Sequence, residues 1–263
     1  MLIELKPLQM NTNAERKVTL IGAGPGDPDL ITVKGVKALE KAAVVLYDAL
    51  INRELLAYAP NAKKIFVGKR KDFHRYTQDE INELIVKSAF EFGNVVRLKG
   101  GDPFIFGRGS EEIDYVEFFG IETEVISGIS SSMAVPASQG ISLTKRGISE
   151  SFWVITGTTS EKKLSNDVYL AAQSTATIVI LMGMSKLNQI VSVFKQFEKA
   201  NVPTAIIQNG TTVNEKIGLG TINTIEEVVE QKQLSSPAII VIGEVVKESA
   251  KLRLFFENIN AQF

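Results

Sequence analysis

The chain has 263 residues, a formal net charge of −1 and no cysteine. This length accommodates one large domain or two of ordinary size, and the hydrophobic content of 44% is typical of a globular protein. The lack of cysteine excludes disulfides, thiolate catalysis and zinc–thiolate sites, and the single histidine, His74, excludes a histidine-rich metal site. We therefore expect no metal. A net charge near zero also argues against a nucleic-acid partner.

We expect no targeting or membrane signal in this sequence. No apolar run is long enough to span a bilayer. The first residues include Glu4 and Lys6 and offer no small-residue cleavage site, so they do not resemble a secretory signal. We expect residues 1–16 to form a polar leader. We also expect the protein to be cytoplasmic and to make no contact with a membrane.

Strands alternating with helices are predicted along residues 17–132. The strands are expected at 17–23, 44–47, 65–67, 94–98 and 122–126, and the helices at 29–43, 77–92 and 111–119. Asp29 is expected near the N-cap of the first helix, and Thr77 with Glu80 has the pattern of a capping box. This alternation favours a mostly parallel α/β sheet, which forms an N-terminal α/β domain.

A second α/β domain is predicted over residues 151–250. Residues 133–150 are rich in Ser, Gly and Pro and are expected to bridge the two domains. The strands are expected at 151–156, 177–182, 204–208, 216–221 and 238–241, and the helices at 167–172, 186–199 and 224–233. Residues 251–263 are expected to form a C-terminal tail. The predicted fold class is thus α/β, with two α/β domains.

Glycine-rich turns follow three of the predicted strands of the first domain. They occur in VTLIGAGPGDP from residue 18, in VVRLKGGDPFIFGRGSEE from residue 95, and in VISGISSS from residue 125. Gly100 and Gly101 allow a close backbone approach or a positive φ, and Asp102 can bind either a ligand or its own loop. Because parallel strands end at a common edge of their sheet, the three turns predict a ligand-binding crevice there.

The first turn also suggests a dinucleotide site, but the pattern is incomplete. GAG begins like GxGxxG, and Asp48 ends the next strand, where a ribose-binding acid would lie. Asp27, however, stands where the third glycine should be and would repel a pyrophosphate. Pro25 and Pro28 keep the helix N-terminus away from the turn. The sequence therefore disfavours dinucleotide binding.

Charged residues near these turns allow two interpretations. Asp48 is either a solvent-facing strand end or helix cap, or a functional acid beside the first turn. The segment GKRKDFHR, from residue 68, contains five basic residues if His74 is counted, and it is either a solvated charge run or a docking surface for a polyanion. Further cations near predicted loops are Arg97, Lys99, Arg108, Lys145 and Arg146. Their concentration at loops favours an acidic small molecule as the ligand.

A set of ordered segments carries a family resemblance from about residue 17 to about residue 247. They are VTLIGAGPGDPDLITVKG, VVLYDALI, FVGKR, TQDEIN, VVRLKGGDPFIFGRGSEE, GISLTKRGISESF, MGM, NGTT and SPAIIVIGEVV. Together they resemble the tetrapyrrole methylase family. GKR, RLKGGDPFIFGRG and NGT point to its branch of uroporphyrinogen-III C-methyltransferases.

The resemblance implies two α/β domains of the tetrapyrrole methylase type, with S-adenosylmethionine in the cleft between them. The residues that match the cofactor contacts of the family are Pro25, Gly100, Gly101, Asp102, Ile105, Ser130, Ser131, Met182 and Gly210. Asp48 and Lys69 match positions proposed as proton acceptor and proton donor, and are the implied catalytic residues.

The implied reaction is two successive methyl transfers to carbons C2 and C7 of uroporphyrinogen III. Its products are precorrin-2 and S-adenosylhomocysteine. Precorrin-2 then serves sirohaem and cobalamin biosynthesis. The substrate is an acidic tetrapyrrole, and the residues expected to bind it are Arg70, His74, Arg108, Lys145 and Arg146. The resemblance also implies a homodimer. Two alternative activities within the family stay open: methylation of another precorrin, or diphthine-type methylation of a protein. Outside the family, the alternatives are a Rossmann dehydrogenase and a nucleotide-binding regulatory module.

Overall fold

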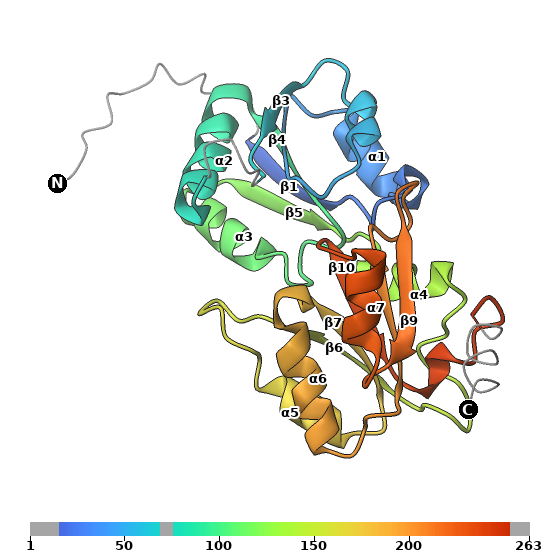
Figure 1. The fold of residues 1–263 in the computed structure, drawn as a ribbon. Coiled ribbons are helices and arrows are strands. Elements are labelled where there is room, and N and C mark those ends of the chain that lie inside the picture. Colours follow the sequence, from blue (N-terminus) through green and yellow to red (C-terminus); the bar gives the residue numbers. More distant parts are fainter. Residues whose placement is uncertain (1–15, 69–75, 253–263) are drawn as a thin grey trace. The chain divides into compact units, whose positions relative to one another are not determined.

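A computed structural model describes residues 16–68 and 76–252 (Figure 1). The chain forms two compact units that divide between Ser130 and Ser131, and each contains a five-stranded sheet. Residues 133–150, the expected bridge, fall within the second unit. Among the described residues, no helix is both long enough and apolar enough to cross a membrane.

The first unit is built on a parallel sheet with strand order β3-β2-β4-β1-β5. Its strands are β1 (Lys17–Gly22), β2 (Val44–Tyr47), β3 (Lys63–Phe66), β4 (Asn94–Lys99) and β5 (Glu122–Ile126). The predicted parallel α/β sheet is therefore confirmed here. The central strands β1 and β4 are almost wholly buried, as expected for strands covered on both faces.

Helices cover both faces of this sheet. They are α1 (Val33–Leu39), α2 (Gln78–Phe92) and α3 (Gly109–Phe118), with short 3₁₀ helices η1 (Pro28–Leu30) and η2 (Arg53–Tyr58). Successive strand residues point to opposite faces, so Leu20 packs with Ile85 of α2, whereas Ile21 packs with Leu39 of α1. Helices α2 and α3 lie side by side on one face (Figure 1).

The starts of two helices test the predicted caps. The capping box of α2 is confirmed. Thr77 Oγ1 accepts a hydrogen bond from the backbone N–H of Glu80, and the Glu80 carboxylate accepts one from the backbone N–H of Thr77. The predicted cap at Asp29 is wrong: α1 begins after Thr32, whose Oγ1 accepts from the N–H of Gly35 at 3.1 Å. Asp27 instead caps the separate turn η1, and the chain is extended at Thr32, which delays the α-helix.

The second unit contains a mixed sheet with strand order β6-β7-β10-β8-β9. Its strands are β6 (Phe152–Thr156), β7 (Thr177–Leu181), β8 (Pro203–Gln208), β9 (Lys216–Thr221) and β10 (Ala238–Ile242). Only β6 and β7 pair in parallel; the other three pairings are antiparallel. Because β7 and β8 both run antiparallel to β10, they end at the same edge of the sheet.

Two layers of helix enclose the second sheet. The helices are α4 (Ser131–Ser138), α5 (Asp167–Gln173), α6 (Leu187–Gln196) and α7 (Ile225–Lys232), with 3₁₀ turns η3 (Met184–Lys186) and η4 (Glu244–Val246). Val168, Ile190 and Ile225 bring α5, α6 and α7 onto one face. Val135 of α4 and Val245 of η4 pack on the other. Helix α4 was not predicted and lies largely within the expected bridge.

Candidate functional site

Gly22, Gly101 and Gly128 meet backbone to backbone where β1, β4 and β5 end; we call this contact the glycine junction. A Cβ atom on Gly22 would lie 2.4 Å from Cα of Gly128, and one on Gly128 would lie 2.2 Å from the carbonyl oxygen of Gly101. Gly24 and Gly101 also exchange backbone hydrogen bonds, at 2.7 and 3.3 Å. The three glycine-rich turns thus lie together at one edge of the sheet, as the sequence predicts.

Asp102 ties two of these turns together. Its Oδ1 accepts from the N–H of Phe104 at 2.8 Å, and its Oδ2 accepts from the N–H of Gly128 at 3.1 Å. The sequence allows Asp102 to bind either a ligand or its own loop, and in the structure it binds its own loop. Carboxylate oxygens that accept backbone N–H groups hold a turn more firmly than neutral acceptors do.

An exposed apolar run follows Asp102. Phe104, Ile105 and Phe106 have 55%, 44% and 45% of their surface exposed, although large apolar side chains are usually covered. Phe106 and Arg108 adopt positive φ values of 52° and 57°, which are unfavourable for residues other than glycine. Backbone strain of this kind is typical of ligand-binding loops.

Asp48 follows β2 and is ion-paired. Its Oδ1 accepts from Nη2 of Arg97 at 2.6 Å, and its backbone N–H donates to the carbonyl of Leu98 at 3.3 Å. The side chain remains 26% exposed. Asp48 is thus neither a loose solvent-facing strand end nor a helix cap.

Arg97 and Lys99 were expected beside the loops, and the structure corrects this expectation. Both are buried, and both bind the buried carboxylate of Glu112 on α3, through Arg97 Nε at 3.2 Å and Lys99 Nζ at 2.9 Å. We call Asp48, Arg97, Lys99 and Glu112 the buried ion cluster. Gln78 of α2 adds a hydrogen bond to Glu112 at 3.2 Å.

The two cations of the cluster respond differently to burial. Burial alone would lower the pKa of Arg97, but attraction to Asp48 and Glu112 and the hydrogen bonds to both raise the pKa above its usual value. Burial, together with repulsion from Arg97, lowers the pKa of Lys99 despite the attraction of Glu112. The cluster was not predicted from the sequence, although cations inside a buried strand require acidic partners.

The other expected substrate-binding cations lie on the surface where they are described. Arg108 pairs with Glu111 at 2.6 Å, and Lys145 pairs with Glu248 at 2.6 Å. Arg146 is exposed in a tight turn closed by backbone hydrogen bonds between Lys145 and Ser149. Three predicted residues, Lys69, Arg70 and His74, lie outside the described residues.

Two predicted cofactor residues, Met182 and Gly210, follow β7 and β8 and so lie at one edge of the second sheet. The backbone of Met182 has a positive φ of 55°, its side chain is half exposed, and its carbonyl accepts from Oγ1 of Thr158 at 2.9 Å. A Cβ atom on Gly210 would lie 2.3 Å from a methyl group of Val135.

The remaining predicted cofactor residues are Pro25, Gly100, Ser130 and Ser131. Pro25 lies between two glycines with positive φ, and Gly100 precedes the glycine junction. Ser130 and Ser131 flank the division between the units.

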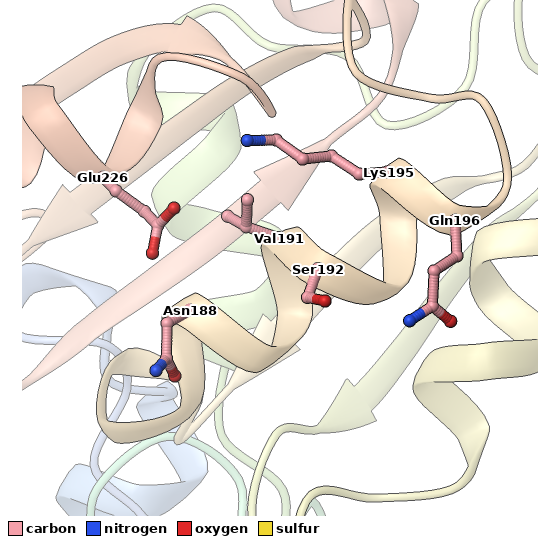
Figure 2. Close-up of a pocket in the computed structure, with 6 residues that line it drawn as sticks. All are labelled: Asn188, Val191, Ser192, Lys195, Gln196 and Glu226. Atoms are coloured by element: carbon pink, nitrogen blue, oxygen red, sulfur yellow. The ribbon is translucent and has the colours of Figure 1, made fainter.

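A hollow with a volume of about 490 Å³ lies elsewhere in the second unit. Figure 2 shows the residues that line it. The hollow lies over α6 and the start of α7, and its lining is Asn188, Val191, Ser192, Lys195, Gln196 and Glu226. None of these residues belongs to a predicted site. Among the described residues, no group of three or more His, Asp or Glu side chains is arranged to hold a metal ion.

Comparison with known proteins identifies the family. Residues 17–226 match the family described as tetrapyrrole (corrin/porphyrin) methylases. The chain is 49% identical to a uroporphyrinogen-III C-methyltransferase of Methanocaldococcus jannaschii, over 88% of this chain and 96% of that protein.

Two solved structures resemble the fold. One is the uroporphyrin-III C-methyltransferase of Thermus thermophilus complexed with S-adenyl homocysteine, at 34% identity and a TM-score of 0.76, over 88% of this chain and 99% of that one. The other is a cobalt precorrin-4 methyltransferase, at 26% identity and a TM-score of 0.78, over 88% and 96%. The family match spans most of the sequence, and the glycine-rich turns that carry the resemblance lie together in the structure. The chain therefore belongs to the tetrapyrrole (corrin/porphyrin) methylases.

Proposed function

We propose that this protein transfers two methyl groups from S-adenosylmethionine to C2 and C7 of uroporphyrinogen III, and so makes precorrin-2 for sirohaem and cobalamin biosynthesis. The observation that carries the proposal is the position of Asp48. It follows β2, and the glycine-rich turns follow the parallel strands β4, β1 and β5, so a candidate base and a candidate cofactor loop share one sheet edge.

The residues at this edge fit S-adenosylmethionine, which supplies an electrophilic methyl group on a sulfonium. The glycine junction presents backbone groups without side chains in the way, and Phe104, Ile105 and Phe106 offer exposed apolar surface. A ligand with a charged amino-acid end and a flat adenine end needs both kinds of surface. The residues proposed to hold it are Pro25, Gly100, Gly101, Asp102, Ile105 and Ser130 in the first unit, and Ser131, Met182 and Gly210 in the second.

The protein's own groups would manage protons and substrate charge. The pyrrole carbons of the substrate are electron-rich, so alignment with the methyl group contributes more than a strong protein nucleophile would. Asp48 accepts the proton that each methylated ring must lose, and Lys69 acts as the proton donor. Arg70, His74, Arg108, Lys145 and Arg146 bind the substrate carboxylates. Arg108 already pairs with Glu111, and Lys145 with Glu248. The carboxylates of the substrate would replace these two partners.

An assay with defined substrates tests the reaction. The protein is incubated without oxygen with uroporphyrinogen III and S-adenosylmethionine, and the product is followed by absorbance and mass spectrometry. We expect a product heavier by two methyl groups and release of S-adenosylhomocysteine. If the wild-type protein binds S-adenosylmethionine but methylates only another precorrin, that precorrin takes the place of uroporphyrinogen III as the proposed substrate. Turnover of NAD without methyl transfer would reject the reaction class.

Replacing Arg146 with alanine is expected to weaken substrate binding selectively. Its exposed guanidinium lies in a turn and is assigned to the substrate carboxylates, so KM for uroporphyrinogen III should rise several-fold while the Kd for S-adenosylmethionine stays unchanged. Lys163→Ala removes another exposed cation of the second unit, one that pairs with Glu161, and serves as the control. Equal effects of both changes on KM would assign the loss to overall charge.

We also propose that the protein is a cytoplasmic homodimer. Phe118, at the end of α3, is 83% exposed and forms an edge-to-face contact with Phe119, so apolar surface is available for a partner subunit. Phe255 and Phe256, the second pair of adjacent phenylalanines in the sequence, lie outside the described residues. Light scattering at micromolar concentration should give about twice the 28.8 kDa of one chain. A mass near that of one chain would reject the dimer.

A further inference from the structure

Arg97 connects the candidate base to the interior of the first unit. Its Nη2 donates to Asp48 at 2.6 Å, its Nε donates to Glu112 at 3.2 Å, and its Nη1 donates to the carbonyl of Leu98 at 3.3 Å. We propose that Arg97, held by Glu112, is a positioning residue that fixes the carboxylate of Asp48 for proton transfer. This inference rests on the proposed role of Asp48.

The three contacts define where the Asp48 carboxylate lies. A guanidinium is planar and carries its donors in a rigid fork, so two fixed anchors determine the position of the third donor. Here the anchors are the backbone of β4 and the carboxylate of Glu112, which is fully buried and also bound by Lys99 and Gln78. Asp48 is tied to β4 a second time through its backbone N–H.

Exposure distinguishes Asp48 from the rest of the buried ion cluster. The side chains of Arg97, Lys99 and Glu112 are 2%, 5% and 0% exposed, whereas that of Asp48 is 26% exposed. The cluster therefore begins in the core and ends at one carboxylate that a substrate can reach. Its two cations and two anions are balanced in formal charge, and among the described residues no buried side-chain nitrogen or oxygen lacks a hydrogen-bond partner.

Stability alone is a weak reason for such a cluster. Replacing buried ion pairs with apolar residues of similar volume is often neutral or stabilising, because desolvation offsets most of the attraction. A cluster that orients one accessible carboxylate has a further use.

Arg97→Lys tests the inference, because lysine keeps the charge but cannot reach all three partners. We expect kcat to fall about tenfold or more, the effect of one charge-assisted hydrogen bond, with little change in KM or in the Kd for S-adenosylmethionine. Lys17→Met is the control: it removes ion pairs with Glu122 and Glu124 at the start of the neighbouring strand β1, outside the buried ion cluster. We expect its kcat to stay within about threefold of the wild type. Equal losses of kcat in both variants would overturn the inference.

A double-mutant cycle separates positioning from general disturbance. Measured in an Asp48→Asn background, Arg97→Lys should lower kcat by less than about twofold, because its effect passes through Asp48. Independent, multiplicative losses would overturn the inference. Asp48→Asn with wild-type turnover would instead refute the role of Asp48, and a wild-type protein without methyl transfer would refute the proposed function. If Arg97→Lys does not fold, Glu112→Gln replaces it in the cycle with the same expected coupling.

Discussion

Replacing Asp48 with asparagine is expected to slow methyl transfer by about a hundredfold or more, because acid–base groups typically contribute that much. The variant keeps the shape of the side chain and one oxygen for Arg97, but it cannot accept a proton. Single-turnover measurements with bound S-adenosylmethionine report the transfer step directly. The Kd for S-adenosylmethionine, measured by calorimetry, should change little, since Asp48 is not among the residues assigned to that ligand.

The Asp48 experiment needs a control for folding, because the change leaves Arg97 without one of its two carboxylate partners. Thermal unfolding of the variant shows whether this loss lowers stability, and activity is then compared well below the midpoint. Glu54→Gln removes an exposed acid a few residues further along the chain and should leave the rate unchanged. Turnover at the wild-type rate in Asp48→Asn would return Asp48 to a purely structural role.

Gly128→Ala is expected to destabilise the first unit by about 3 kcal/mol or more, at the upper end of the cost of overpacking. The added methyl group would lie 2.2 Å from the carbonyl oxygen of Gly101 and 2.6 Å from Cα of Gly22. All of these atoms are backbone at the ends of strands, so no side-chain rotation relieves the clash. Urea unfolding followed by far-UV circular dichroism measures the loss.

Gly120→Ala provides the contrast for this experiment. Gly120 has a φ of +69°, but a Cβ atom there would have nothing within 4 Å, so the change tests backbone conformation without steric contact. We expect a loss of about 1 kcal/mol. The single tryptophan, Trp153 in β6, reports separately on the second unit. Similar losses for Gly120→Ala and Gly128→Ala would show that the junction relaxes around a methyl group.

The first sheet and its turns could be predicted because the sequence pattern there is local. Apolar strands, each followed by glycines, imply parallel strands that end at one edge, and the order β4-β1-β5 places three such ends next to one another. The sequence did not determine how closely the turns meet. Contacts such as that between Gly22 and Gly128 depend on strand order, which a single sequence does not state.

The buried ion cluster could have been anticipated in part. Arg97 and Lys99 lie in a strand whose other residues are apolar, and buried cations need acids. On α3, Gly109, Glu112 and Val116 are buried and share one face by their spacing, which marks Glu112 as an inward-facing acid. The pairing itself is a tertiary contact between a strand and the next helix, and it could not be read from either segment alone.

The second sheet shows the limit of reading strands without their connections. Strands β8 and β9 are separated by only seven residues, 209–215, which is too short for the crossover that a parallel pair requires. An antiparallel hairpin was therefore predictable from loop length. Helix α4 was not, since Ser, Gly and Pro dominate its surroundings and Pro136 lies within it.

The glycine junction has a consequence for the thermodynamics of ligand binding. Loops that become ordered only when a ligand arrives lose conformational entropy at that moment, and the affinity falls accordingly. In this protein, Gly22, Gly101 and Gly128 fix three loops against one another during folding, before any ligand is present. The loops are preorganised, so a ligand that fits them meets a surface whose shape is already set by the sheet beneath.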